Sequence, residues 1–488
     1  MPVNFLTNEQ NINYGKYPEK LTSEQLSKYF YLDERDKKLI NACRRDYNKL
    51  GYALQLTTLR FLGTFISDLT STPCTVVTYL SKQLKIDDPK SIELYLERKA
   101  TCSNHINKIK SEFNYQNFNS VWRFRLTKWL YSQVWLSNDR PSLLFERIVS
   151  WLIIRRIILP GISTLEILIS KIRERVSQRL WKKLSSLASV DQKDKLENLL
   201  LIPPGKRYSK LDELKKGPTR ISSKGLVQAL KRYQFIRDIG VGKINFGNIP
   251  KAKIHHLARY VTISWAPSIA RMSENRRLSV LLSFAFVYEI KALDDALDLL
   301  DILITEITSQ AKRIGEKNRV RNIRDLDKAA LKLSDFSDFF VKNENKKNIS
   351  KLLYKEFSKN TILNAVQVIR EIARPSHDKY YDELLSQYKT VRRFLPKLFN
   401  TISFISTKEG GPIKKGIDFL ISTEGKRNPS FEDAPIDFIG AGWRDIVIEP
   451  SKKEINRQGY TLCAMDHLQA NLRSRDIFVK QSERWCDP

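Results

Sequence analysis

Cysteine is scarce in this 488-residue chain: its five cysteines lie far apart, with no CxxC pair and no cluster with histidine. Zinc ribbons need closely spaced thiolates, and disulfide scaffolds need a dense set of cysteines. The spacing therefore excludes a zinc ribbon and argues against a disulfide scaffold. It predicts a protein of the reducing cytoplasm.

Long apolar runs are also absent. A helix that crosses a bilayer needs about 20 apolar residues, and the best candidate, Trp151–Pro160, is interrupted by Arg155 and Arg156. The amino-terminal residues lack the basic and apolar pattern of a secretory signal. The sequence predicts neither insertion into a membrane nor secretion.

The motifs of common enzymes are missing as well. There is no GxxxxGK phosphate loop, and Gly240-Val-Gly242 is not extended into a dinucleotide fingerprint. The five histidines lack the spacing of zincins, and no nucleophile elbow occurs. We therefore expect no small-molecule substrate and no cofactor in this chain.

One set of carboxylates does have a spacing that suits a metal. Asp294, Asp298 and Asp301 lie at i, i+4 and i+7, on one face of a predicted helix. Such a face could hold Mg²⁺ for phosphoryl transfer. We favour the alternative of a polar helix face, either solvated or neutralised by a basic neighbour, because two-metal nucleases draw their carboxylates from different elements.

Positive charge is in large excess. The chain has 84 lysines and arginines against 54 acidic residues, for a formal net charge of +30. Residues 101–250 hold 28 basic and 11 acidic side chains, a net of +17, whereas residues 401–488 hold 13 of each. A concentrated excess of one sign is typical of proteins that bind phosphates. Together with 10% aromatic residues, it predicts a nucleic-acid partner.

Nearly every periodic segment has helical spacing, and no block is rich in strands, so the sequence predicts an all-α fold. Thr22, Asp33 and Ser222 are expected to cap helices. A long basic helix is expected over 164–187, capped by Ser163 or Thr164 and with Glu166 in its first turn. Another is expected over 274–314, with a break or bend near its middle.

Aromatic residues alternate with basic ones in 121–135. Base stacking beside phosphate contacts would use this composition. Trp122 and Trp129 are seven residues apart on one helical face, however, which core packing explains more simply. We assign the tryptophans to the core and the basic residues to the surface.

Several strings of residues follow one another along the whole chain in the order of a known family: Phe5–Gln10, Thr22–Phe30, Asn48–Phe65, Phe124–Leu136, Gly217–Arg220, Asp294–Leu300, Thr390–Pro396, Tyr460–Cys463 and Ser482–Trp485. They resemble the Tn-three family of replicative transposases, whose opening region is catalogued as a domain of unknown function. The resemblance implies a homodimer that binds double-stranded DNA at the terminal inverted repeats of a transposon.

The resemblance also implies what this chain does not do. The family's catalytic triad binds Mg²⁺ in a ribonuclease-H-like domain that is expected to lie beyond Pro488, so the chain is expected to bind transposon ends without cutting them. Asp294, Asp298 and Asp301 do not match that triad.

One alternative is a truncated regulatory protein that occupies the ends and inhibits the full-length transposase. Another is a complete transposase of which this sequence is a part. A membrane-surface protein is disfavoured, because no basic amphipathic segment stands apart from the folded helices.

This interpretation predicts a multi-domain helical array. Residues 1–90 would form a helix-turn-helix-like DNA-binding module, although a plain helical bundle fits nearly as well, and 91–215 a second basic helical module. Residues 216–400 would add DNA contacts and a dimerisation or scaffold region. Residues 401–488 would begin a linker toward the catalytic domain and be only partly ordered. The residues expected to contact DNA are Arg44, Arg45, Arg60, Arg123, Arg125, Arg155, Arg156, Arg173, Arg175, Arg179, Lys182, Lys183, Arg220 and Lys224.

Overall fold

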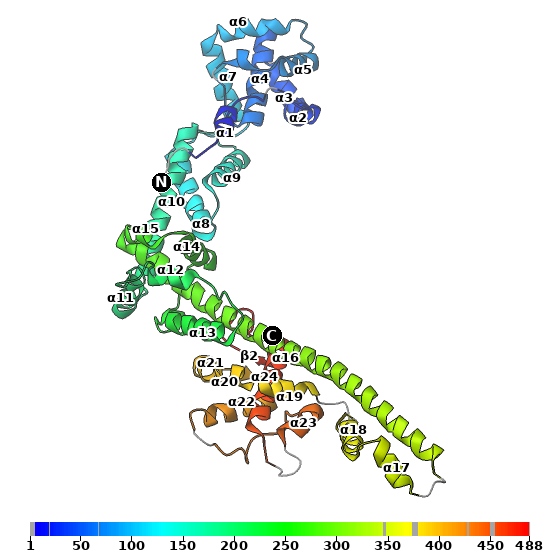
Figure 1. Ribbon diagram of the computed structural model, residues 1–488. Helices are drawn as coiled ribbons and strands as arrows, with labels where there is room; N and C mark the ends of the chain where they lie inside the picture. Colours follow the sequence, from blue (N-terminus) through cyan, green and yellow to red (C-terminus); the bar gives the residue numbers. More distant parts are fainter. Residues whose placement is uncertain are drawn as a thin grey trace. The chain divides into compact units, whose positions relative to one another are not determined.

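The computed structural model describes residues 5–18, 20–66, 68–344, 348–372, 379–426, 429–448 and 454–487 (Figure 1). Within these residues the chain is helical apart from one antiparallel pair of two-residue strands, β1 (Ile405–Ser406) and β2 (Ile477–Phe478). The predicted all-α fold is confirmed. None of the described helices is both long and apolar enough to cross a membrane.

The chain packs into two compact units. Unit 1 comprises Met1–Leu187, Phe246–Leu257 and Ser273–Ser279, and unit 2 comprises Ala188–Asn245, Ala258–Met272 and Val280–Pro488. The predicted division into four domains at 90, 215 and 400 stays a prediction.

Unit 1 contains two hydrophobic cores. The elements are α1 (Asn8–Asn13), α2 (Ser23–Tyr29), α3 (Glu34–Asn41), α4 (Asp46–Leu62), η1 (Leu69–Ser71), α5 (Cys74–Leu84), η2 (Pro89–Ser91), α6 (Ile92–Leu96), α7 (Lys99–Glu112), α8 (Ser120–Leu136), α9 (Pro141–Ile154) and α10 (Ile162–Ser185). The first core gathers α2 to α7, and the second gathers α8, α9 and α10 together with Phe5, Leu6 and Tyr14, which flank α1.

Helix α4 is the centre of the first core. All residues from Leu50 to Leu59 are buried, so the helix has no exposed side over this stretch. At Gly51, an added Cβ would lie 2.4 Å from the ring of Tyr95, which shows how closely α6 approaches. A recognition helix needs an exposed face to enter a DNA groove. Over Leu50–Leu59, α4 has no such face.

Two of the expected caps begin helices in this region. Thr22 and Asp33 both form complete capping boxes, with Gln25 and Asp36 respectively. The cap expected for the long basic helix is wrong: α10 begins earlier, at Ile162, directly after Gly161, and has no side-chain cap. Glu166 consequently lies on the buried side of α10 rather than at an exposed first turn.

Unit 2 is built around a long helix, α16 (Glu274–Lys342), which contains residues of both units and has no break over its 69 residues. The helix extends well beyond the expected end at 314, and of the break or bend considered near its middle, the break does not occur. Helix α14 (Lys251–Ile263) also contributes to both units. The other elements are α11 (Val190–Asn198), α12 (Lys210–Lys215), α13 (Ser223–Arg237), η3 (Val241–Lys243), α15 (Ala266–Ala270), α17 (Ile349–Glu356), α18 (Lys359–Ile372), α19 (Lys379–Ser386), α20 (Tyr388–Arg392), α21 (Leu395–Thr401), α22 (Gly411–Thr423), α23 (Ala441–Val447) and α24 (Arg457–Ser474).

The carboxyl-terminal region is folded into unit 2. Helix α24 buries most of its side chains, among them Tyr460 and Cys463. The ring of Tyr460 makes edge contacts with Phe419, Phe431 and Phe438. The expectation of only partial order over 401–488 is therefore wrong for the residues described there, because α24 supplies a core that the sequence pattern did not reveal.

Candidate nucleic-acid interface

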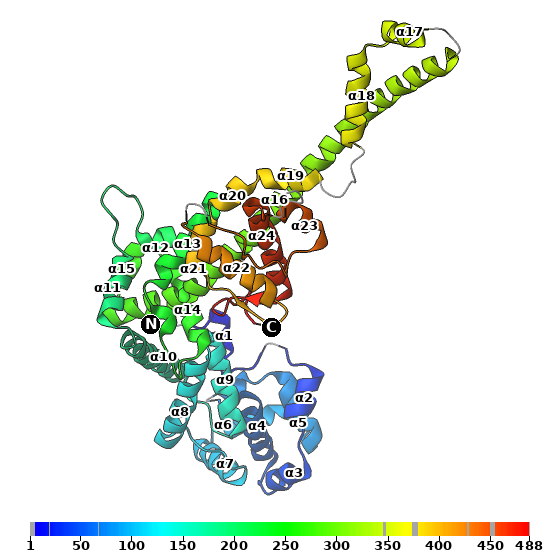
Figure 2. The same ribbon diagram turned by 90° about the horizontal axis from the view of Figure 1, so that it is seen from below.

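The largest group of predicted contact residues lies on α8, on α10 and directly after the end of α9. The three helices lie side by side in both views (Figures 1 and 2). Helix α8 buries Leu126, Leu130 and Val134, so its basic residues are left on the outside. Among the predicted contacts here, Arg123, Arg125, Arg175, Arg179 and Lys182 are exposed, and Arg173 and Lys183 are partly buried. The amphipathic pattern thus placed most of these cations on the surface, as expected.

A cluster of three tryptophans joins α8 to α9. The ring of Trp151 lies 5.5 Å from that of Trp129 and 6.2 Å from that of Trp122. All three are partly buried and pack against the second core of unit 1. Trp122 and Trp129 therefore belong to the core, as predicted, but they lie at its edge and not at its centre.

Two predicted contact residues flank this tryptophan cluster. The Arg125 guanidinium lies 4.7 Å from the Trp122 ring, and that of Arg155 lies 4.1 Å from the Trp151 ring. Stacking on an aromatic face holds a guanidinium in place and leaves its N–H groups able to donate to an anion. The structure thus places Arg125 and Arg155 against the rings of one tryptophan cluster.

Arg179 is held in the same manner on the other part of α8. Its Nη1 donates to the Tyr131 hydroxyl at 2.9 Å, and its guanidinium lies 5.8 Å from the Trp135 ring. Arg156 instead donates to the Phe113 carbonyl at 3.0 Å, and its backbone has a φ of 57°. Arg156 therefore ties the two cores of unit 1 together while its side chain stays exposed.

Lys253 is a cation that the sequence prediction missed. It belongs to unit 1 and donates to the Ser137 carbonyl at 2.5 Å, just beyond the end of α8. Burial, and then the nearby Arg173 charge, lower the pKa of Lys253 from 10.5 to about 8. Burial likewise lowers the pKa of Arg173. No local signal in the sequence connects 137, 173 and 253, because only the fold brings them together.

The turn before α4 presents Arg44 and Arg45, which are both exposed. Arg45 has a φ of 71°, and its Nη1 donates to the Tyr47 hydroxyl at 2.9 Å. A positive φ is strained for a residue with a side chain and marks a turn that the surrounding structure imposes. Arg98, which was not predicted, lies 5.5 Å from the same Tyr47 ring.

Arg60 does not share this exposure. Both of its terminal nitrogens lie 2.6 Å from the carboxylate oxygens of Asp36, whose side chain is fully buried. The geometry is a bidentate ion pair that joins α3 to α4. The guanidinium of Arg60 is thus already engaged within the first core.

Arg220 and Lys224 lie in unit 2, at the start of α13, and both are exposed. Ser222 caps α13 as predicted, by accepting from the Gly225 amide. A Cβ at Gly225 would lie 2.2 Å from the Arg220 carbonyl oxygen, so glycine is required for this tight turn. The turn fixes the direction in which the chain leaves Arg220.

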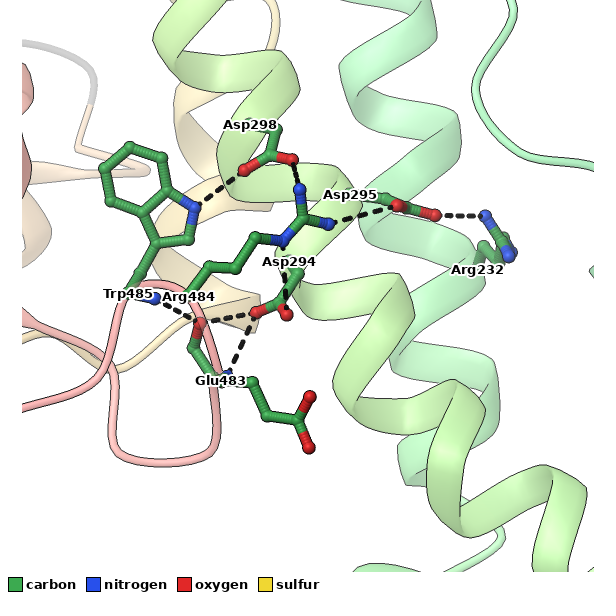
Figure 3. Close-up of polar contacts among 8 residues, drawn as sticks. Arg232, Asp294, Asp295, Asp298, Glu483, Arg484 and Trp485 are labelled. Carbon is green, nitrogen blue, oxygen red and sulfur yellow. Dashed lines mark hydrogen bonds and ion pairs between the residues drawn. The ribbon is translucent and has the colours of Figure 1, made fainter. Parts of the chain in front are cut away.

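The carboxylates of α16 are bound by protein donors (Figure 3). Asp294 is buried and accepts from the Ser482 hydroxyl at 2.5 Å and from the Glu483 amide at 3.3 Å. Asp298 accepts from the indole of Trp485 at 2.8 Å and from the guanidinium of Arg484.

Two further aspartates complete this polar face. Asp295 lies between Arg484 at 3.6 Å and Arg232 at 3.2 Å, and Asp301 accepts from Arg473 at 2.7 Å. These protein donors occupy the face on which Mg²⁺ was considered. The sequence pattern favours a polar face that is either solvated or neutralised by a basic neighbour. The structure shows the second alternative, because arginines of the protein pair with the aspartates.

Comparison with known sequences identifies the class of the first part of the chain. A family model described as a domain of unknown function (DUF4158) matches residues 5–172, which include α8 and nearly half of α10.

The whole chain is similar to known transposases. It is 41% identical over 490 residues to the transposase for transposon gamma-delta of Escherichia coli (strain K12), covering 100% of this chain and 49% of that protein. It is 26% identical over 487 residues to the transposase for transposon Tn1546 of Enterococcus faecium, covering 99% of this chain and 49% of that protein. The resemblance to Tn-three family transposases is thus confirmed, and the chain spans about half the length of these curated relatives.

Proposed function

We propose that this chain is a DNA-binding part of a Tn-three-type transposase and that it recognises the terminal inverted repeats of a transposon. The observation that carries the proposal is the arginine-bearing surface of α8, α9 and α10, in a chain similar throughout to transposases. A cytoplasmic, DNA-associated homodimer without catalytic metal belongs to the same proposal.

The binding follows from the chemistry of these side chains. Guanidinium groups donate to phosphate oxygens, and each neutralised phosphate releases counterions, so affinity depends steeply on salt. Arg125 and Arg155 rest on indole rings and lose little side-chain entropy when they bind. Exposed neighbours such as Arg123 and Arg175 would add contacts to the backbone or to base edges.

The test compares binding of the chain to an inverted-repeat duplex and to a scrambled duplex across a range of salt concentrations. The triple variant Arg123→Gln, Arg125→Gln, Arg155→Gln should bind both duplexes at least tenfold more weakly and show a smaller salt slope. The matched control is Lys408→Gln, Lys415→Gln, Lys480→Gln, three exposed cations in the region 401–488, which is not predicted to contact DNA. Equal binding by the wild type and the triple variant would refute the proposal.

A second candidate function is the truncated regulatory protein that occupies transposon ends. The observation that favours it is the same pair of ring-stacked arginines, because a protein that only occupies the ends needs this binding surface and no chemistry. Co-expression with a complete transposase should then reduce transposition, and the triple variant should not. An unchanged transposition frequency would exclude this role.

A further inference from the structure

A pocket of about 370 Å³ lies in unit 2 and is lined by residues of α20, α21, α22 and α24. Figure 2 shows these four helices close together. Its apolar part is formed by the buried side chains of Leu395, Phe399 and Leu420. This volume is in the range of small-ligand sites and exceeds that of a bare phosphate ion. The apolar surface could receive the sugar or base that a phosphate group carries.

Three cations from distant segments line the same pocket. Arg392 is the last residue of α20, Lys426 follows the end of α22, and Arg457 is the first residue of α24. None of these three side chains has an ion-pair partner in the part of the chain that the structure describes. Glu424 is the one carboxylate among the lining residues. The lining therefore has an excess of positive charge, with three cations against the single carboxylate of Glu424.

The backbone contributes little to this charge. The amides at the start of α24 are already used, because the Asn456 side chain accepts from Gln458 and Gly459. Recognition of an anion here depends on the arginine and lysine side chains, which substitution can remove without disturbing a helix cap.

Net charge along the sequence gave no sign of this site, since residues 401–488 hold equal numbers of basic and acidic side chains. Glu424 is the one acidic residue of this region that lines the pocket, whereas Asp418, for example, pairs with Lys414 on α22. Folding separates the two signs and gathers Arg392, Lys426 and Arg457 around one pocket.

We infer that this pocket binds the phosphate group of a nucleotide, with Arg392, Lys426 and Arg457 as the binding residues. The phosphate could belong to a DNA strand or to a free nucleotide. The DNA source rests on the proposed function, whereas the phosphate chemistry does not.

The first experiment measures the thermal unfolding of the full chain with a deoxynucleoside monophosphate, with inorganic pyrophosphate, and with the phosphate-free nucleoside. The two phosphates should raise the Tm of the wild type, because a ligand that binds only the folded state stabilises it. The nucleoside should not. The double variant Arg392→Gln with Arg457→Gln should lose the shift, and the control Lys389→Gln with Lys415→Gln, two exposed cations of unit 2, should keep it.

The second experiment measures binding of the same variants to duplex DNA at several salt concentrations. If the phosphate belongs to DNA, the double variant should lower the salt slope by about 1, since the one phosphate held in the pocket contributes roughly 0.9. A thermal shift with free phosphates and an unchanged DNA slope would assign the site to free nucleotides.

The inference is overturned if the double variant has both the thermal shift and the DNA slope of the wild type. That result would leave the proposed function standing whenever the triple variant on α8 and α9 still loses DNA affinity. Conversely, the wild-type chain could bind no DNA and still show a Tm shift with free phosphates that the double variant loses. That result would refute the proposed function and support this site.

Discussion

Arg60 offers a sharp test, because its sequence position and its structural surroundings suggest different roles. As a basic residue near the end of α4 it was predicted to contact DNA, yet both of its terminal nitrogens lie 2.6 Å from the carboxylate of Asp36. Asp36 is fully buried, and one of its oxygens also accepts from the Asp33 amide at the start of α3. Replacing Arg60 with leucine would leave that carboxylate buried without its counter-ion.

The expected cost follows from the burial of the pair. Removing one partner of a buried ion pair typically costs about 3–5 kcal/mol. The Arg60 side chain is 25% exposed, so water can partly replace it, and the lower end of about 3 kcal/mol applies. For a unit of about 200 residues this corresponds to a fall in Tm of roughly 6–12 °C.

The assay is thermal unfolding of Arg60→Leu, followed by DNA binding at a temperature well below its midpoint. The variant should unfold early but bind DNA within threefold of the wild type, because a fully paired guanidinium contributes little to an external phosphate. Adding Asp36→Asn to Arg60→Leu should recover part of the lost stability, since no unpaired charge then remains buried. A variant that unfolds within 2 °C of the wild type and loses tenfold in DNA affinity would refute this reasoning.

Two further predictions concern Asp294 and Lys253. The substitution Asp294→Ala should expose the segment around Ser482 to protease and cost about 1–3 kcal/mol, because a buried hydroxyl and an amide lose their acceptor; Asp191→Asn, at an exposed carboxylate of unit 2, should do neither. DNA affinity should fall as pH rises through about 8, because Lys253 loses its proton there and a nearby phosphate favours the charged form. The variant Lys253→Arg should flatten that pH profile, and an equally steep profile in the variant would exclude Lys253 as the cause.

Local features of the fold could be predicted from the sequence. Thr22, Asp33 and Ser222 cap helices because a capping side chain bonds to amides only a few residues away. The start of α10 was misplaced because Gly161 begins it without a side-chain cap, and a helix can start at such a residue without any local signal.

Contacts between distant segments could not be predicted. Arg484 and Asp298 are 186 residues apart, and nothing in either sequence neighbourhood specifies the other. The spacing of Asp294, Asp298 and Asp301 placed them on one helix face, but a metal, water and a basic segment all satisfy such a face. The decision between them needed the position of Ser482–Trp485, which only the folded chain provides.

The sequence does not show which charges are paired with one another in the folded chain. The net charge of +30 therefore overstates the number of cations that are available to DNA. A guanidinium that already has a carboxylate partner adds little attraction for DNA, since its charge is balanced at short range. Arg60, Arg232 and Arg484 are all of this kind, whereas Arg123 and Arg175 have no ion pair within the described residues. The number of phosphates that the chain neutralises should therefore follow its unpaired cations rather than its sequence total. The salt slope should therefore be lower by about 1 than that expected from all the predicted contact residues, because Arg60 would be missing from it and the partly buried Arg173 would contribute less.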